Sequence, residues 1–299
     1  MFREYVHLAE DAFIAPAQTL YLHGCNLSCV FCQTGGERKT FPGRELTPRL
    51  FREILDNGRR RGAVSVDILG GEPGVNLPAL LDVFAAVEDF PLLVWNTNLY
   101  ITAEACALLD GVVDVFLADV KFGNPECAQR LSGRKDATRT AWERAKEIFA
   151  RTPDALVLRH LAMPGHFSCC TRPLLEAIRA SFPGVRVSLR TVYLPPHSLP
   201  DDMAEKRFSS RGDIIRVLRL AGALGLNLTR DAVLWENGMA GPGRLAALGE
   251  NKTGDSVEFE LTINPAGEVF LRHAVPEAVD VLKAVGSNIG DGTGAFTHA

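Results

Sequence analysis

Three cysteines within eight positions are the residues whose type and spacing most directly suggest chemistry. Cys25, Cys29 and Cys32 form a C-x3-C-x2-C run just after a short apolar segment. Thiolates this close on one loop can ligate an iron–sulfur cluster, which normally takes four protein ligands, so one iron would lack a protein ligand. Zinc is the alternative, but no second C-x2-C pair lies nearby and His23 is the only neighbouring candidate for a fourth ligand. Buried thiols without a metal are the third possibility.

A glycine-rich turn, Gly70-Gly71-Glu72-Pro73, is the second pattern that could bind a ligand. Its glycines would let the backbone approach another group closely. Alone, such a turn is typical of an ordinary connection between a strand and a helix. Because it follows the strand next in sequence after the cysteine run, the two together indicate one binding site.

The scaffold predicted for these residues alternates strands and helices six times. Regular alternation predicts a parallel sheet, here a partial (β/α)6 barrel, with functional loops beyond the carboxyl ends of the strands. Thr47-Pro48 and Thr171-Arg172-Pro173 are typical helix starts. The predicted strands are Leu20 to His23, Val64 to Leu69, Leu92 to Asn96, Val112 to Val120, Leu156 to Ala162 and Val185 to Tyr193. The predicted helices are about Thr47 to Arg61, Leu77 to Ala86, Ala103 to Leu109, Thr138 to Ala150, Arg172 to Ser181 and Ser209 to Leu224.

The sequence becomes Gly-rich and alternating past about Gly225. Ser256 to Ile263 and Glu268 to Ala274 flank Asn264-Pro265-Ala266-Gly267, which predicts a β-hairpin. We therefore expect a barrel domain over residues 1–224 and a small β-rich extension over 225–299.

The cysteine run and the glycine turn together resemble the radical S-adenosylmethionine (SAM) superfamily. The resemblance implies that Cys25, Cys29 and Cys32 hold a [4Fe–4S] cluster whose open iron is chelated by SAM, and that Gly70 to Pro73 binds the SAM amino group. Phe31 takes the position of an aromatic residue that packs on adenine in this superfamily, although a core residue would look the same. The implied reaction is reductive cleavage of SAM to a 5′-deoxyadenosyl radical, which abstracts hydrogen from a small-molecule, peptide or protein substrate. A flavodoxin or ferredoxin would be the reductant.

Later motifs resemble relatives of pyruvate formate-lyase activating enzyme. In that family a D-T-N-G turn, a D-x-K strand end and a late histidine line the SAM pocket. The resemblance therefore places Asn96 and Asn98 at the pocket, but Asn96 replaces the acidic residue and Leu99 replaces the glycine. His197 matches the late histidine only approximately. The segments that carry this resemblance are Trp95 to Asn98, Asp119 to Lys121, Arg159 to Leu161, Met163 to Gly165 and Tyr193 to Pro195.

Two charged residues and one histidine at strand ends are further candidates for the SAM pocket. Asp119 and Lys121 alternate with apolar residues and should point into the barrel, where Lys121 would reach the SAM carboxylate and Asp119 would orient it. A self-satisfied ion pair is the alternative. His160 shares its side with Leu156 and Leu158, so it is either a site residue or a core histidine, and Arg159 must point the other way.

Composition limits the remaining possibilities. The 299 residues carry a net charge of -4, so a nucleic-acid partner is not expected. Neither a membrane span nor a signal peptide is recognisable, which predicts a cytoplasmic protein with no membrane partner. The seven cysteines should be reduced. We expect the four outside the triplet to be scattered structural thiols, with Cys169 or Cys170 a minor candidate for radical or thiol chemistry; the four are Cys106, Cys127, Cys169 and Cys170.

Two further functional hypotheses remain beside a radical SAM enzyme acting on a small molecule or a peptide. One is an activase that abstracts hydrogen from a backbone glycine of a glycyl-radical enzyme. The other is a non-catalytic iron–sulfur or zinc-binding protein, which predicts no SAM cleavage.

Overall fold

The computed structural model describes residues 1–7, 11, 13–35, 41–193, 195–196, 199, 203–229, 243–250, 256–263 and 269–272. Within these residues the chain forms an eight-stranded sheet and a separate three-stranded sheet. His197 and Leu194 of the late motif lie outside the described residues.

The larger sheet has the strand order β1-β2-β3-β4-β5-β6-β7-β8. β1 is antiparallel to β2, and each later neighbouring pair is parallel. Among the described residues β8 does not pair with β1, so the sheet is an open partial barrel, as expected. The strands are β1 (Arg3–His7), β2 (Ala17–Leu22), β3 (Ser65–Gly70), β4 (Leu92–Thr97), β5 (Val115–Asp119), β6 (Leu156–Leu161), β7 (Arg186–Arg190) and β8 (Asn227–Leu228). All six predicted strands are present, and β1 and β8 extend the sheet at its two edges.

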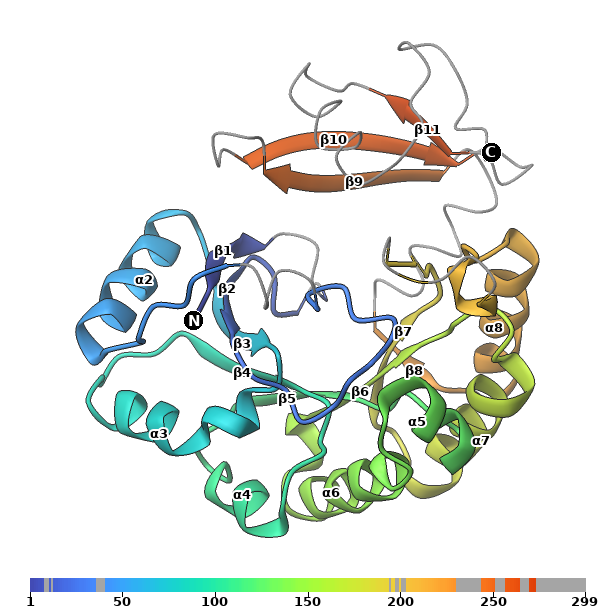
Figure 1. Ribbon diagram of the computed structural model, residues 1–299, viewed down its shortest axis with the longest axis horizontal. Coiled ribbons are helices and arrows are strands. Elements are labelled where there is room, and N and C mark those ends of the chain that lie inside the picture. The colour runs from blue at the N-terminus through green and yellow to red at the C-terminus, as the bar shows by residue number, and fades with distance from the viewer. Residues whose placement is uncertain are drawn as a thin grey trace.

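Helices cover the convex side of this curved sheet (Figure 1). They are α2 (Pro48–Arg60), α3 (Leu77–Ala85), α4 (Ala103–Leu108), α5 (Pro125–Ser132), α6 (Ala137–Arg151), α7 (Arg172–Ser181) and α8 (Arg211–Ala223). The Thr47 side chain caps α2 by accepting from the Leu50 amide at 3.2 Å, and Pro48 begins the helix, as predicted. The expected cap at Thr171 is wrong, because a π turn over Phe167–Thr171 precedes α7 and the Thr171 hydroxyl lies 3.0 Å from His160 instead.

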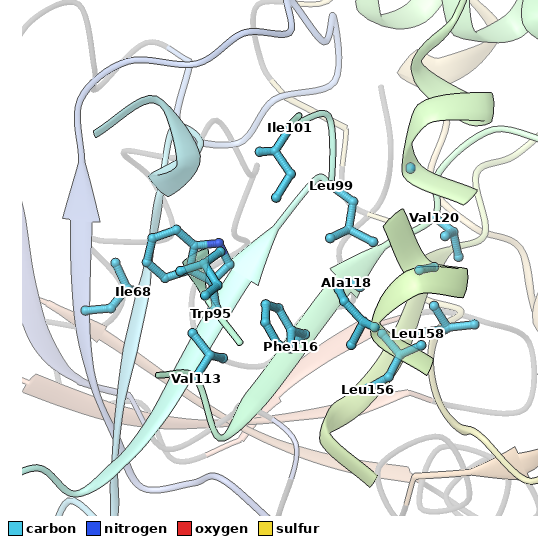
Figure 2. Close-up of a cluster of buried hydrophobic side chains, with 14 of the residues drawn as sticks. Ile68, Trp95, Leu99, Ile101, Val113, Phe116, Ala118, Val120, Leu156 and Leu158 are labelled. Atoms are coloured by element: carbon cyan, nitrogen blue, oxygen red, sulfur yellow. The ribbon is translucent and has the colours of Figure 1, made fainter. Parts of the chain in front are cut away.

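The two faces of the parallel strands bury different side chains. Trp95, Phe116 and Leu158 point toward the helices and belong to the main apolar core, part of which Figure 2 shows. Leu117 and Val157 point the other way and, with Ile14, Val94 and Val115, form a small apolar cluster inside the barrel. Because side chains alternate along a strand, the residues that follow this inner row at the strand ends also point into the lumen.

The smaller sheet is antiparallel, with β10 (Ser256–Ile263) between β9 (Gly243–Glu250) and β11 (Val269–Arg272). Ile263 pairs with Val269, so β10 and β11 form the predicted hairpin; β9 is an additional strand. In the part of the chain that the structure describes, no helix has the length and apolar character to cross a membrane.

Candidate active site

The cysteine run lies on the loop that leaves the carboxyl end of β2. Cys25, Cys29 and Cys32 are all partly buried, and none forms a disulfide. Burial raises the pKa of the Cys29 thiol to about 12, and the positive charge of nearby Lys121 offsets only part of that rise. A thiol in this environment becomes a thiolate at neutral pH only with a further positive partner such as a metal. Three such thiols on one loop fit a metal centre, including an iron–sulfur cluster with one iron left without a protein ligand.

The carboxyl end of helix α5 holds the cysteine loop by backbone hydrogen bonds. The amides of Ser28 and Val30 each donate to a carbonyl at the end of α5, Ser132 and Leu131 respectively, both at 2.9 Å. Phe31 is buried in an apolar cluster with Leu131, and its ring meets that of Phe122 edge-on with centroids 6.1 Å apart. The predicted contact between Phe31 and adenine stays a prediction.

The glycine turn lies directly against the start of the cysteine loop. The Gly71 amide donates to the Leu22 carbonyl at 2.9 Å and the Glu72 amide to the Gly24 carbonyl at 2.8 Å. A Cβ at position 71 would lie 1.5 Å from the Gly24 oxygen, so only glycine allows this approach. Gly70 has a φ of +115° and its carbonyl accepts from the Thr34 hydroxyl at 3.2 Å. The turn and the cysteine loop thus form one rigid unit.

Glu72 is fully buried and ties this unit to the end of β4. One carboxylate oxygen accepts from the Gly74 amide at 3.0 Å and the Thr97 hydroxyl at 2.7 Å, and the other accepts from the Asn98 amide at 2.7 Å. Burial raises the pKa of Glu72, while these three hydrogen bonds favour the charged form. Pro73, also buried, begins the short 3₁₀ turn Pro73–Asn76. These contacts hold the glycine turn against the end of β4.

The β4 loop brings Asn98 to the cysteines. The side-chain nitrogen Nδ2 of Asn98 lies 3.1 Å from Asn26 Oδ1 and 3.9 Å from Cys25 Sγ. Leu99, where the resembling family has glycine, adopts a φ of 54°, the left-handed conformation that glycine adopts most easily. Its side chain is fully buried in the main core (Figure 2), so burial stabilises a backbone shape that the side chain itself disfavours.

A charged network fills the lumen above the inner apolar row. Asp119 forms ion pairs with Lys121 and, at 2.6 Å, with Arg159. Arg159 also donates to Asn96, whose amide lies 3.3 Å from Asp67 on β3. Burial opposes ionisation of Asp119, but the two cations outweigh it and lower the pKa of this carboxyl. Asn96 therefore links Arg159 to Asp67, a buried carboxylate on the neighbouring strand β3.

A small cavity lies between these loops and helices α6 and α7, which contribute Ala137, Trp142 and Leu174 to its lining. Its lining includes Leu27 from the cysteine loop, Asn98 from the β4 loop, and Asp119, Lys121 and Phe122 from the end of β5. The structure therefore brings together residues from three of the predicted loops.

His160 does not join this site. Its ring is buried on the helix-facing side of β6, with Nδ1 2.8 Å from the Val120 carbonyl oxygen and Nε2 3.0 Å from the Thr171 hydroxyl. Burial lowers the pKa of His160 to about 4, so the ring is neutral at neutral pH. The expectation that His160 lines the cofactor pocket is corrected: Arg159, the next residue back, is the one that points into the lumen.

The cysteines outside the triplet are not scattered as expected. Cys127, Cys169 and Cys170 gather around His166, with all four possible ligand atoms within 4.8 Å of one another. Only Cys106 fits the expectation, since it is fully buried in the main core. Sequence reasoning missed this cluster, although the two strands concerned are adjacent and parallel. Cys127 lies eight residues after the end of β5, and Cys169 lies eight residues after the end of β6.

Comparisons with known proteins agree with this geometry. The family model described as the Radical SAM superfamily matches residues 19–178. The uncharacterized protein MJ0674 of Methanocaldococcus jannaschii is 31% identical over 240 residues, which cover 76% of this chain and 68% of that protein. The chain therefore belongs to the radical SAM superfamily, and its cofactors are SAM and a [4Fe–4S] cluster.

Solved structures share the fold at low identity. A radical SAM methyltransferase from Sphaerobacter thermophilus superposes with a TM-score of 0.53 at 16% identity, covering 72% of this chain and 66% of that one. Streptococcus suis SuiB bound to its precursor peptide SuiA gives a TM-score of 0.50 at 16% identity, covering 70% of this chain. The match spans 47% of SuiB, about half its length.

Proposed function

We propose that this protein is a radical SAM enzyme whose cluster is held by Cys25, Cys29 and Cys32 and whose SAM lies between the glycine turn and the β4 loop. The observation that carries the assignment is the direct contact between the turn and the cysteine loop at Gly71, together with the anchoring of both to Asn98 through Glu72. Three separate segments are fixed around one point, as a site for a cluster and its chelating ligand requires.

The bound cluster and SAM supply one-electron reductive cleavage, which allows hydrogen abstraction from an organic substrate. The chain itself binds and positions the reactants. Gly70 and Gly71 offer backbone carbonyls to the SAM amino group, Lys121 pairs with the SAM carboxylate while Asp119 orients it, and Phe31 packs on adenine. The inner apolar row keeps water from the base of the lumen.

The substrate reaches the lumen through the open side of the barrel and meets a charged wall made by Asp119, Arg159 and Asn96. A polar small molecule, a peptide, or a loop of a partner protein can hydrogen-bond there, including a backbone glycine of a glycyl-radical enzyme. Peptides are a reasonable first choice because SuiB was crystallised with its precursor peptide. The reductant in the cell is a flavodoxin or a ferredoxin. The finer resemblance to relatives of pyruvate formate-lyase activating enzyme stays a prediction.

The test is anaerobic reconstitution, reduction with dithionite and assay for 5′-deoxyadenosine, with and without peptide, small-molecule and glycyl-radical-protein substrates. We expect the wild-type protein to release 5′-deoxyadenosine, and Cys29→Ala to lose both the four-iron absorbance and the product. Cys106→Ala, which removes a buried thiol far from the loop in sequence, should retain both. A Cys29→Ala protein that keeps the four-iron absorbance would refute the ligand assignment.

A further inference from the structure

A second group of metal-binding side chains lies outside the site described above. Among the residues that the structure describes, Cys127, His166, Cys169 and Cys170 are the one set of histidine, cysteine and acidic side chains close enough to share a metal ion. His166 and Cys170 are buried, and Cys127 and Cys169 are partly buried. The proposed function uses none of these four residues.

We propose that these four side chains hold a single zinc ion in tetrahedral geometry. His166 Nδ1 lies 3.7 Å from Cys127 Sγ, 3.4 Å from Cys169 Sγ and 3.7 Å from Cys170 Sγ, and the Cys127 and Cys169 sulfurs are 3.8 Å apart. Zinc bonds of about 2.3 Å to sulfur and about 2.0 Å to nitrogen would place the sulfurs about 3.8 Å apart and the nitrogen about 3.5 Å from each sulfur. The four separations given above match these values, and the two remaining sulfur–sulfur pairs, which involve Cys170, lie within 4.8 Å.

The same distances favour a single ion over two other uses of such a cysteine group. A disulfide between Cys127 and Cys169 would need a sulfur–sulfur distance of about 2.05 Å, whereas the observed distance is 3.8 Å. A four-iron cluster bonds each ligand to a different iron, so its ligand atoms must lie farther apart than those around one ion. All four atoms here lie within 4.8 Å of one another, which fits a single ion.

The histidine is held with the correct nitrogen toward the sulfurs. His166 Nε2 lies 2.6 Å from a carboxylate oxygen of Glu205, which is fully buried and also accepts from Arg130 at 2.6 Å. Arg130 Nη2 lies 3.1 Å from the same Nε2, but the Glu205 oxygen is the nearer partner at 2.6 Å. Because that carboxylate only accepts hydrogen bonds, the shorter contact favours a proton on Nε2, which leaves the Nδ1 lone pair for the metal. A carboxylate behind a ligating histidine is a recurrent feature of zinc sites.

Local structure explains how two consecutive cysteines point to one ion. Cys169 and Cys170 lie in the π turn, where the amide of Thr171 donates to the His166 carbonyl at 3.1 Å. This wider turn reduces the angle between consecutive side chains, and π turns often occur at functional sites. A Cβ at Gly123 would lie 2.5 Å from the Cys169 carbonyl oxygen, so glycine lets the β5 loop approach the turn.

Asn124 then joins the two segments. Its side chain caps α5 by accepting from the Cys127 amide at 2.8 Å, and it donates to the Cys169 carbonyl at 2.9 Å. The same amide nitrogen lies 3.4 Å from Cys127 Sγ, where it can stabilise a thiolate. Four protein ligands complete the coordination of zinc, so the ion is structural and links the start of α5 to the loop before α7.

The experiment is metal analysis of the full-length protein purified anaerobically with added Zn²⁺, combined with X-ray absorption at the zinc edge. We expect one zinc per chain beside the cluster iron, with three sulfur ligands and one nitrogen ligand. Cys127→Ser and His166→Gln should each lose that zinc and keep the cluster iron. Cys106→Ala, which changes a thiol outside the group, should lose neither metal.

A variant of the cysteine triplet, Cys29→Ser, separates the zinc proposal from the proposed function. Cys29→Ser should lose iron and keep zinc, and a wild-type protein that binds zinc but no four-iron cluster would contradict only the proposed function. Wild-type protein without zinc, a lone iron in its place, or zinc retained in both Cys127→Ser and His166→Gln would overturn the zinc site. The absorption measurement uses wild-type protein, so it decides the matter even if a variant fails to fold.

Discussion

Leu99 is the position where the effect of a mutation can be worked out most fully. A non-glycine residue in the left-handed region costs about 1–2 kcal/mol, and Leu99 has a φ of 54°. Truncating a buried leucine to alanine costs about 3–5 kcal/mol, and the Leu99 side chain is fully buried. Burial is the larger effect, which explains why leucine is stable at this position.

Comparing alanine with glycine at this position separates the two effects. Leu99→Ala loses the buried side chain and keeps the backbone strain, whereas Leu99→Gly loses the side chain and relieves the strain. We therefore expect Leu99→Gly to be more stable than Leu99→Ala by about 1 kcal/mol, although both are less stable than wild type. In an ordinary conformation the order reverses, because glycine costs about 0.5–1 kcal/mol relative to alanine.

Leu109 provides the matched control. It is equally buried in the same core but has a φ of -87°, an ordinary conformation. Leu109→Ala should therefore be more stable than Leu109→Gly. The assay is urea unfolding of Leu99→Ala, Leu99→Gly, Leu109→Ala and Leu109→Gly, all prepared anaerobically. Their free energies of unfolding are compared with one shared m-value, the slope of free energy against urea concentration. If Leu99→Gly is less stable than Leu99→Ala by the same amount as at Leu109, the strain assigned to Leu99 is refuted.

Two further predictions concern the charged network. Lys121→Ala should weaken SAM binding about tenfold, or about 1.4 kcal/mol, and keep the cluster iron; unchanged SAM affinity by calorimetry would return Lys121 to a structural role. Asp119→Asn should lower the free energy of unfolding by about 3 kcal/mol at neutral pH, because Arg159 and Lys121 lose their shared partner. Since the folded protein lowers the pKa of Asp119, this stabilisation is present above the unfolded value of about 3.9 and is lost at lower pH. Urea titrations from neutral pH to below pH 4 should show wild type and Asp119→Asn converging, with the exposed Asp82→Asn as control; a constant difference between them would contradict the prediction.

Periodicity is sufficient to predict the scaffold because six apolar segments alternate with amphipathic helical segments, and all six strands form. The side of a strand that faces the lumen was harder to predict, since parallel strands are buried on both faces. Leu156 and Leu158 do not indicate which face is inner, so the sequence leaves His160 as either a site residue or a core residue, with Arg159 on the opposite side. The pairing of Arg159 with Asp119 shows the correct direction.

The zinc ligands were missed for a different reason. Cys127 and Cys169 are far apart in sequence, and their meeting depends on how far each loop folds back after its strand. The π turn at Cys169 and Cys170 has no recognisable sequence signal, so nothing indicated that consecutive cysteines point the same way. The adjacency of β5 and β6 was the one clue, since it places equivalent positions of the two following loops side by side.

Helix α5 contributes to both proposed metal sites. At about 1.5 Å per residue its eight residues form a rod about 12 Å long. Cys127 sits in its first turn, and the Leu131 and Ser132 carbonyls that support the cysteine loop belong to its last. One short helix therefore joins Cys127, a proposed zinc ligand, to the carbonyls that hold the loop of the proposed cluster ligands.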